Sequence, residues 1–189
     1  MTDERTQELD EGFALIFSAL LAGIHTATIG EVEDFDRNTR KATIQPALKR
    51  LISGGEPELL PKCEDVPILF PGSGDWSLNF DVVKKSYVLL VITERAIDKW
   101  KNEGGIVDPA IKRKFHLSDG VAIPCLNSFN EVFAPIEADS ISIRNRDNSQ
   151  FFKMVAGKIE AKAPAFKFEG DVEVTGNFSA AGGNWTVDL

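Results

Sequence analysis

Hydrophobic residues recur every three or four positions near the start of the chain, which predicts a helix over residues 7–26. Asp10 and Glu11 stand near its start, where acidic side chains favour the positive end of the helix dipole. The polar face carries no lysine or arginine, which disfavours a helix lying on a membrane surface. We expect the apolar face to dock against the protein's own core or a neighbouring subunit. That face comprises Leu9, Phe13, Ile16, Phe17, Leu20, Leu21 and Ile24.

From residue 26 to residue 126 the pattern changes to the two-residue period of β-strands. Polar or Pro/Gly-rich turns separate the apolar runs, for example at residues 36–40 and 71–75. Several short strands separated by turns favour a small closed barrel, and we predict an OB-type β-barrel. The expected strands are residues 28–35, 41–48, 63–70, 76–82 and 87–92, with a short helix at residues 96–102.

The most regular pattern lies in residues 166–180, where every odd position is polar and every even position is apolar or glycine. Extended chain with this pattern has one buried face and one wet face. The run exceeds the common strand length of about 5–6 residues. The even positions are Phe166, Phe168, Gly170, Val172, Val174, Gly176, Phe178 and Ala180. The phase switches at residues 164–165 and 182–183, and the last alternating positions are Trp185, Val187 and Leu189.

Such a segment cannot cover its own apolar stripe and strand edges. It could fold as a hairpin or meander onto the barrel. It could also form a single-chain left-handed β-helix, since Phe166, Val172 and Phe178 are six residues apart. Alternatively, identical chains could wrap around one axis and pool their stripes. Too few six-residue repeats are present to form several coils, which disfavours the single-chain β-helix. Both histidines lie far from these repeats, which also disfavours a hexapeptide-repeat acyltransferase.

Composition and charge exclude several classes of function. The 189 residues and the 43% hydrophobic share fit one globular domain with an appendage. The net charge of −8 disfavours a nucleic-acid partner, because nucleic acids are polyanions. The apolar stretch at residues 13–24 is shorter than the roughly 20 residues of a membrane span and has no signal-peptide flanks. We therefore expect the chain to be made in a cytoplasm and not exported by a signal peptide.

No catalytic or metal-binding pattern stands out. A zinc site built from Cys63, Cys125, His25 and His116 would lack the close pair spacing of such sites, and the two cysteines are expected to be buried free thiols. Ser118 is near His116, but no nucleophile elbow is present. Nucleotide-binding glycine motifs are also missing. We expect no enzyme activity, no catalytic residue, no cofactor and no bound metal.

Several segments together resemble the N-terminal domain of the central spike proteins of phage baseplates with contractile tails. They span roughly residues 10–126, in the family's order. The segments are His25-Thr-Ala-Thr-Ile-Gly-Glu-Val-Glu-Asp-Phe-Asp, Ala42-Thr-Ile-Gln-Pro-Ala-Leu, Val66-Pro-Ile-Leu-Phe-Pro-Gly-Ser-Gly, Tyr87-Val-Leu-Leu-Val-Ile-Thr-Glu-Arg-Ala-Ile-Asp-Lys-Trp and Arg113-Lys-Phe-His-Leu-Ser-Asp-Gly-Val-Ala-Ile-Pro-Cys. The positions matched to a structural framework motif of that family are His25, Pro67, Pro71, Trp100, His116 and Asp119.

The resemblance implies a mainly all-β chain with an N-terminal helical segment at residues 1–26, an OB-fold barrel at residues 27–139 and an intertwined trimeric β-helix needle at residues 140–189. Such a homotrimer sits in the virion at the centre of the baseplate. It contacts hub and tail-tube proteins, closes the tube and pierces the host envelope when the sheath contracts. The expected core along the trimer axis is Phe166, Phe168, Val172, Val174, Phe178, Trp185 and Val187.

Two departures from the family pattern change these expectations. Residues 83–86 replace the Gly-Asp turn that is usual there, so this loop is expected to differ. The family's tip commonly binds iron through a His-x-His pair, whereas the tail here contains no histidine. We therefore predict no tip metal and either a short blunt needle or a separate tip protein. An alternative function is the spike of a cellular contractile injection system related to phage tails.

Overall fold

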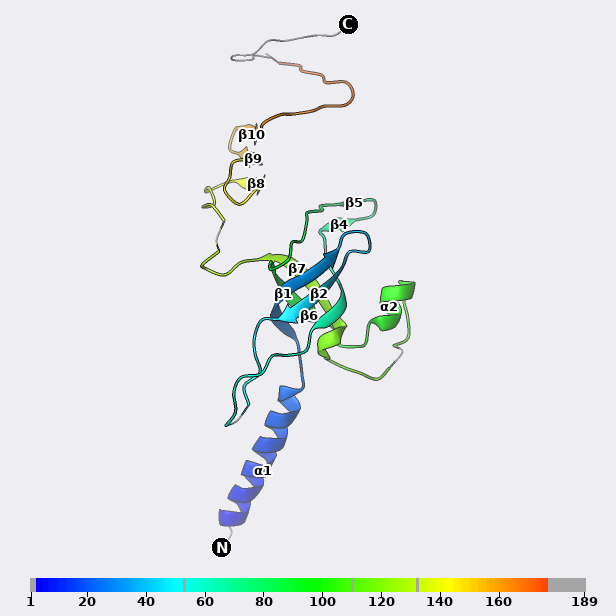
Figure 1. The fold of residues 1–189 in the computed structure, drawn as a ribbon, viewed down its shortest axis with the longest axis vertical. Coiled ribbons are helices and arrows are strands. Elements are labelled where there is room, and N and C mark those ends of the chain that lie inside the picture. The colour runs from blue at the N-terminus through cyan, green and yellow to red at the C-terminus, as the bar shows by residue number, and fades with distance from the viewer. Residues whose placement is uncertain (1–2, 53, 110, 132, 177–189) are drawn as a thin grey trace. The chain divides into compact units, whose positions relative to one another are not determined.

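The computed structural model describes residues 3–52, 54–109, 111–131 and 133–176, and the side chain of Cys125 lies outside this description. The chain divides into two compact units, Met1–Glu131 and Val132–Leu189 (Figure 1). The elements of the first unit are α1 (Asp3–Ala22), β1 (Ala27–Asp36), β2 (Lys41–Pro46), β3 (Cys63–Pro67), β4 (Gly72–Ser73), β5 (Trp76–Ser77), β6 (Tyr87–Ile92), α2 (Asp98–Glu103), a 3₁₀ turn (Leu117–Asp119) and β7 (Gly120–Leu126). The second unit contains β8 (Ile141–Arg144), β9 (Phe151–Val155) and β10 (Lys158–Lys162).

The first unit is built around a five-stranded sheet in the order β3-β2-β1-β6-β7, with antiparallel neighbours (Figure 1). The chain just after β3 reaches β7 through a parallel bridge between Ile68 and Ala122. There the Leu69 N–H donates to the Ala122 carbonyl oxygen at 2.9 Å. This contact brings the two ends of the sheet together, which is consistent with the partly open five-stranded barrel of an OB-like fold.

Alternate residues of these strands point into one hydrophobic core, as the two-residue period predicts. The neighbouring strands β1 and β2 approach closely at Gly30, where an added Cβ would lie 2.2 Å from Ile44 Cγ2. Glycine is needed at this position because any side chain would displace the Ile44 methyl group. The core consists of Val32, Ala42, Ile44, Cys63, Val66, Ile68, Val82, Val88, Leu90, Ile92, Leu117 and Ala122.

Parts of the predicted pattern are wrong in detail. The expected strand at residues 76–82 is only the two-residue β5, which pairs with β4. Within residues 78–82, Val82 is buried and Phe80 packs on the core, although the chain there forms no strand. The barrel's fifth strand is instead β7, a segment for which the apolar pattern predicted no strand. The first helix begins and ends about four residues earlier than predicted, and α2 is short, as expected.

The second unit is a three-stranded antiparallel meander in the order β10-β9-β8. The turn between β9 and β10 contains Gly157, whose φ of 80° falls in the left-handed region that favours glycine. Between residues 163 and 176 the structure assigns no strand. The predicted domain boundary at residue 139 and the β-helix needle therefore stay predictions.

Candidate functional site

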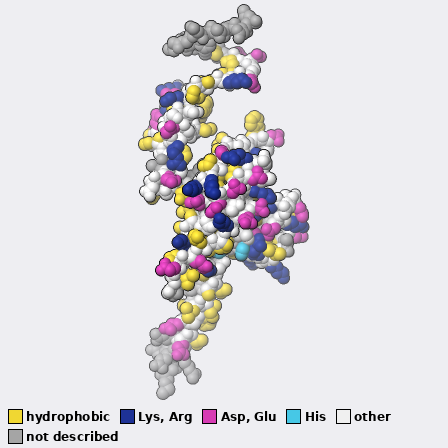
Figure 2. Space-filling view, in the orientation of Figure 1, with side chains coloured by type: hydrophobic (Ala, Val, Ile, Leu, Met, Phe, Trp, Pro, Cys, Tyr) yellow, Lys and Arg dark blue, Asp and Glu magenta, His cyan; other side chains and the backbone are white. Residues whose placement is uncertain are grey.

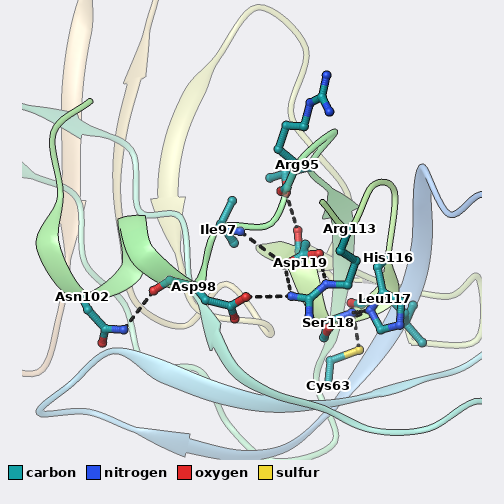
Figure 3. A network of polar contacts seen from close by, with 11 residues as sticks. Cys63, Arg95, Ile97, Asp98, Asn102, Arg113, His116, Leu117, Ser118 and Asp119 are labelled. Carbon is teal, nitrogen blue, oxygen red and sulfur yellow. Dashed lines mark hydrogen bonds and ion pairs between the residues drawn. The ribbon is translucent and has the colours of Figure 1, made fainter. Parts of the chain in front are cut away.

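The most connected polar site in the described part of the barrel surrounds Asp119, whose side chain is fully buried. Two hydrogen bonds from Arg113 hold its carboxylate: Nε to Oδ2 at 2.7 Å and Nη2 to Oδ1 at 2.6 Å (Figure 3). Arg113 Nη2 also donates to Asp98 Oδ2 at 2.9 Å. This paired geometry is the strong form of an arginine–carboxylate contact. We call these three residues the Arg113 network.

Further hydrogen bonds at Asp119 join the chain between β6 and α2 to the loop before β7. The Ile97 N–H, just before α2, donates to Asp119 Oδ1 at 3.3 Å. The N–H and the hydroxyl of Thr93, directly after β6, both donate to the Asp119 carbonyl oxygen at 3.0 Å. Asp119 therefore links the end of β6, the start of α2 and the start of β7. Such a position fits a structural role, in which Asp119 holds these parts of the barrel together.

The electrostatics of Asp119 agree with a structural role. Burial raises the pKa of this carboxyl, but the Arg113 hydrogen bonds, the Ile97 N–H and the Arg113 charge outweigh it, so that the pKa lies below its ordinary value. The same contacts raise the pKa of the Arg113 guanidinium. Both groups are consequently charged at neutral pH.

The geometry does not assemble a hydrolytic triad. The exposed His116 ring accepts the Ser118 N–H through Nδ1 at 3.3 Å, and Nδ1 lies 2.7 Å from the Ser118 hydroxyl oxygen. These contacts cap the 3₁₀ turn. The Asp119 carboxylate, which would orient the imidazole in a triad, instead binds Arg113 and Ile97.

Cys63 lies beneath the same turn, and its Sγ donates to the Leu117 carbonyl oxygen at 3.4 Å. Burial raises the pKa of this thiol to about 11, against a small opposing effect of Lys101. Because the thiolate is the reactive form, we expect alkylation of native Cys63 by iodoacetamide at pH 8 to be at least about tenfold slower than in denaturant. Mass spectrometry of the Cys63 peptide measures this. Fast labelling of the native chain would show that the thiol is not enclosed.

The second unit carries an unusual apolar surface on its meander. Cross-strand pairing aligns Ile141 with Met154 and Ile159, and Ile143 with Phe152 and Ala161. All six residues are exposed, and the five larger side chains range from 42% for Met154 to 71% for Ile141. We call this surface, made of Ile141, Ile143, Phe152, Met154, Ile159 and Ala161, the tail face.

The opposite side of the meander is the better covered one. Lys153 there bonds to Glu137 and Glu160 at 2.7 Å each, and its side chain is only 17% exposed. Hydrogen bonds from Lys153 and Lys158 lower the pKa of Glu160 to about 2. The chain thus partly covers the side that carries these ion pairs, together with Phe151 and Val155, and leaves the six apolar side chains of the tail face in water.

The barrel has an uncharged outer surface of its own. Two cross-strand rows on β1, β6 and β7 align Ala27 with Val91 and Val121, and Ile29 with Leu89 and Ile123. The second row and Val91 are more than a third exposed. We call these six residues the barrel block. A two-by-three apolar patch on the solvent side of a sheet is typical of a protein contact.

A comparison with protein families identifies the barrel. The phage protein Gp138 N-terminal domain matches residues 29–125, which is about half of the chain. The chain belongs to the Gp138 N-terminal domain family. It is therefore a phage protein, which suggests a place in the virion. No curated protein matches the chain.

The matched Gp138 N-terminal domain runs from β1 to β7, so that it contains the Arg113 network and lacks α1 and the meander. Among the framework positions, His116 and Asp119 lie together in the 113–120 loop. The His25 N–H reaches this loop at the Phe115 carbonyl oxygen, at 3.0 Å. Trp100 lies on α2, and Pro67 and Pro71 flank the chain after β3. The framework positions that the resemblance implies include Asp119 but not its partner Arg113.

The predicted axis residues lie outside the Gp138 N-terminal domain. Phe166, Phe168, Val172 and Val174 are at least half exposed in the chain by itself, whereas Phe178, Trp185 and Val187 lie outside the described residues. In the described part of the chain, no three His, Cys, Asp or Glu side chains come together as metal ligands. Among the helices that the structure describes, none combines the length and the apolar character needed to cross a membrane.

Proposed function

We propose that this phage protein is the structural central spike of a tail baseplate, acting as a homotrimer that closes the tail tube and pierces the host envelope. The observation that carries the proposal is the tail face. Six apolar side chains line one side of the meander, while ion pairs occupy the other side. The apolar face of this three-stranded sheet is left in water in the single chain, and further copies of the same face would complete a hydrophobic interior.

Three copies offer a simple geometry for this completion. Each chain turns its tail face toward a common axis, where the six side chains of each meander pack against those of the other two. The alternating segment at residues 166–176 continues the same arrangement, with Phe166, Phe168, Val172 and Val174 pointing inward. Its strand edges then pair between chains. Closed edges and a shared core give a stiff rod that unfolds slowly and transmits force.

The proposed function is mechanical, and the chemistry of the barrel fits it. The Arg113 network fastens the barrel, and the His116 ring caps a turn. Hub and tail-tube proteins are the proposed partners, and the barrel block supplies an uncharged surface for them. A separate tip protein and the host envelope are the proposed contacts of the needle.

Static light scattering of the full chain, of 20.8 kDa, tests the proposal. We expect a mass of three chains at micromolar concentration. A shortened chain that ends at Asp139 keeps the barrel and loses the tail face, and we expect its trimer to weaken or vanish. A full chain that is a folded monomer in dilute solution contradicts the spike function.

A further inference from the structure

Helix α1 leaves a broad apolar face without a partner. Leu9, Phe13, Ile16 and Leu20 are between 57% and 62% exposed. Figure 2 shows hydrophobic side chains along this helix, with acidic groups toward its N-terminal end. From Gly12 to Gly30 the sequence contains no Asp, Glu, Lys or Arg. An exposed apolar surface of this length marks a contact with another molecule.

In the described structure, the helix does not cover this face with its own barrel. The His25 N–H is bonded to Phe115, and the Thr26 carbonyl oxygen accepts the Ile92 N–H at 2.8 Å, so both residues are fixed to the barrel. Only Gly23 and Ile24 lie between them and the helix. Their N–H groups donate to the carbonyl oxygens of Leu20 and Leu21 at 3.2 and 3.0 Å, which continue the last helical turn. The last helical turn therefore continues almost to the residues that are fixed to the barrel.

The spacing of the apolar residues matches a coiled coil. Leu9, Phe13, Ile16 and Leu20 follow the 4-3-4 spacing of alternating d and a positions. In this register, Phe17 and Ile24 occupy e positions, and Gly12 and Ala19 occupy g positions. Each e position of a parallel coiled coil faces the g position five residues earlier on the neighbouring helix.

The large and small residues are therefore complementary between copies. Phe17 of one helix meets Gly12 of its neighbour, and Ile24 meets Ala19. The seam includes the e positions as well as a and d, which makes it wider than the seam of a two-stranded coil. A bundle of more than two parallel helices can bury an apolar face of this width.

We propose that α1 packs against α1 of two further copies as a parallel three-helix coiled coil, so that the trimer is joined at both ends of the chain. The number of copies rests on the proposed function. The helix bundle lies N-terminal to the barrels and the shared tail core lies C-terminal to them. The barrels are thereby held in one register from both sides, which matches the demand on a device that carries axial force.

Cysteine cross-linking in the full chain tests the helix bundle. Ile16→Cys places a thiol in the seam, and Leu15→Cys places one on the opposite side of the same turn, where Leu15 is 72% exposed. With a short bis-maleimide, Ile16→Cys is expected to form covalent dimers and trimers at least about tenfold faster than Leu15→Cys, because packing raises the local thiol concentration. The unaltered chain gives the baseline of the native cysteines.

Light scattering on the same samples separates the two proposals. A trimer in which both variants react at the same rate overturns the helix bundle and leaves the spike function standing. A monomeric full chain overturns the spike function and the bundle together. If Ile16→Cys disturbs folding, the pair Leu20→Cys and Ala22→Cys repeats the comparison one turn later. Faster reaction at Leu20 supports the bundle, and equal rates overturn it.

Discussion

Replacing Ile143 by Glu is expected to weaken or abolish the trimer while the barrel stays folded. The side chain projects from the tail face, where it aligns with Phe152. In the proposed trimer the variant would bury three like charges around one axis, at a cost of roughly 3–5 kcal/mol for each uncompensated charge. That cost exceeds what a small shared core can supply. Light scattering measures the mass, and circular dichroism reports whether the barrel remains folded.

Ser142→Glu is the matched control, because Ser142 lies on the same strand, is itself exposed and points to the side of the meander opposite the tail face. The same charge at this position is expected to leave the trimer intact. A heat-resistant trimer of Ile143→Glu would show that the tail face does not line the axis. Loss of the trimer in both variants would show that the effect is not specific to that face.

Replacing Arg113 by Met is expected to lower the free energy of unfolding of the barrel by roughly 3–5 kcal/mol, because it leaves the Asp119 carboxylate buried without its charged partner. Thermal unfolding followed by circular dichroism measures the effect. Arg95→Met is the control. Arg95 is half exposed, and its ion pair is with its sequence neighbour Glu94 at 3.5 Å, so its loss is expected to change stability little.

The pH dependence identifies the cause. In the native chain the lowered pKa of Asp119 stabilises the fold above the unfolded value of 3.8, and this contribution is lost as the pH falls through the folded value. Without Arg113, burial raises the pKa instead, so protonation relieves the strain of the buried charge. As the pH is lowered from 7 to 5, the melting temperature of Arg113→Met is expected to rise relative to that of the native chain. An unchanged difference across this range would contradict the assignment.

The apolar pattern predicted much of the barrel, because strands β1, β2, β3 and β6 alternate or are apolar on both faces. The prediction failed where alternating apolar residues are buried although their stretch of chain does not pair into the sheet. Phe80 and Val82 pack on the core from irregular chain, since the two-residue β5 ends at Ser77. Strand β7 was missed because Gly120 and Pro124 interrupt its apolar run.

The candidate surfaces were harder to predict than the strands. Arg113 and Asp119 are six residues apart, and only the folded loop between them makes their groups meet. The tail face did leave a signal, namely the two-residue alternation within the short runs of β8 and β10, whereas β9 is apolar on both faces except at Lys153. The signal could not show that these runs pair into one sheet, or that the pairing gathers the apolar side chains on a single side.

The position of the tail face near the end of the chain has a consequence for biosynthesis. The barrel emerges from the ribosome before the meander, and its described core contains no residue of the meander. The tail face emerges after the barrel, when a folded and acidic barrel already helps to keep each nascent chain in solution. Assembly of the proposed trimer is then an association of chains whose barrels are already folded. Its rate is expected to depend on how many chains a host cell makes at once.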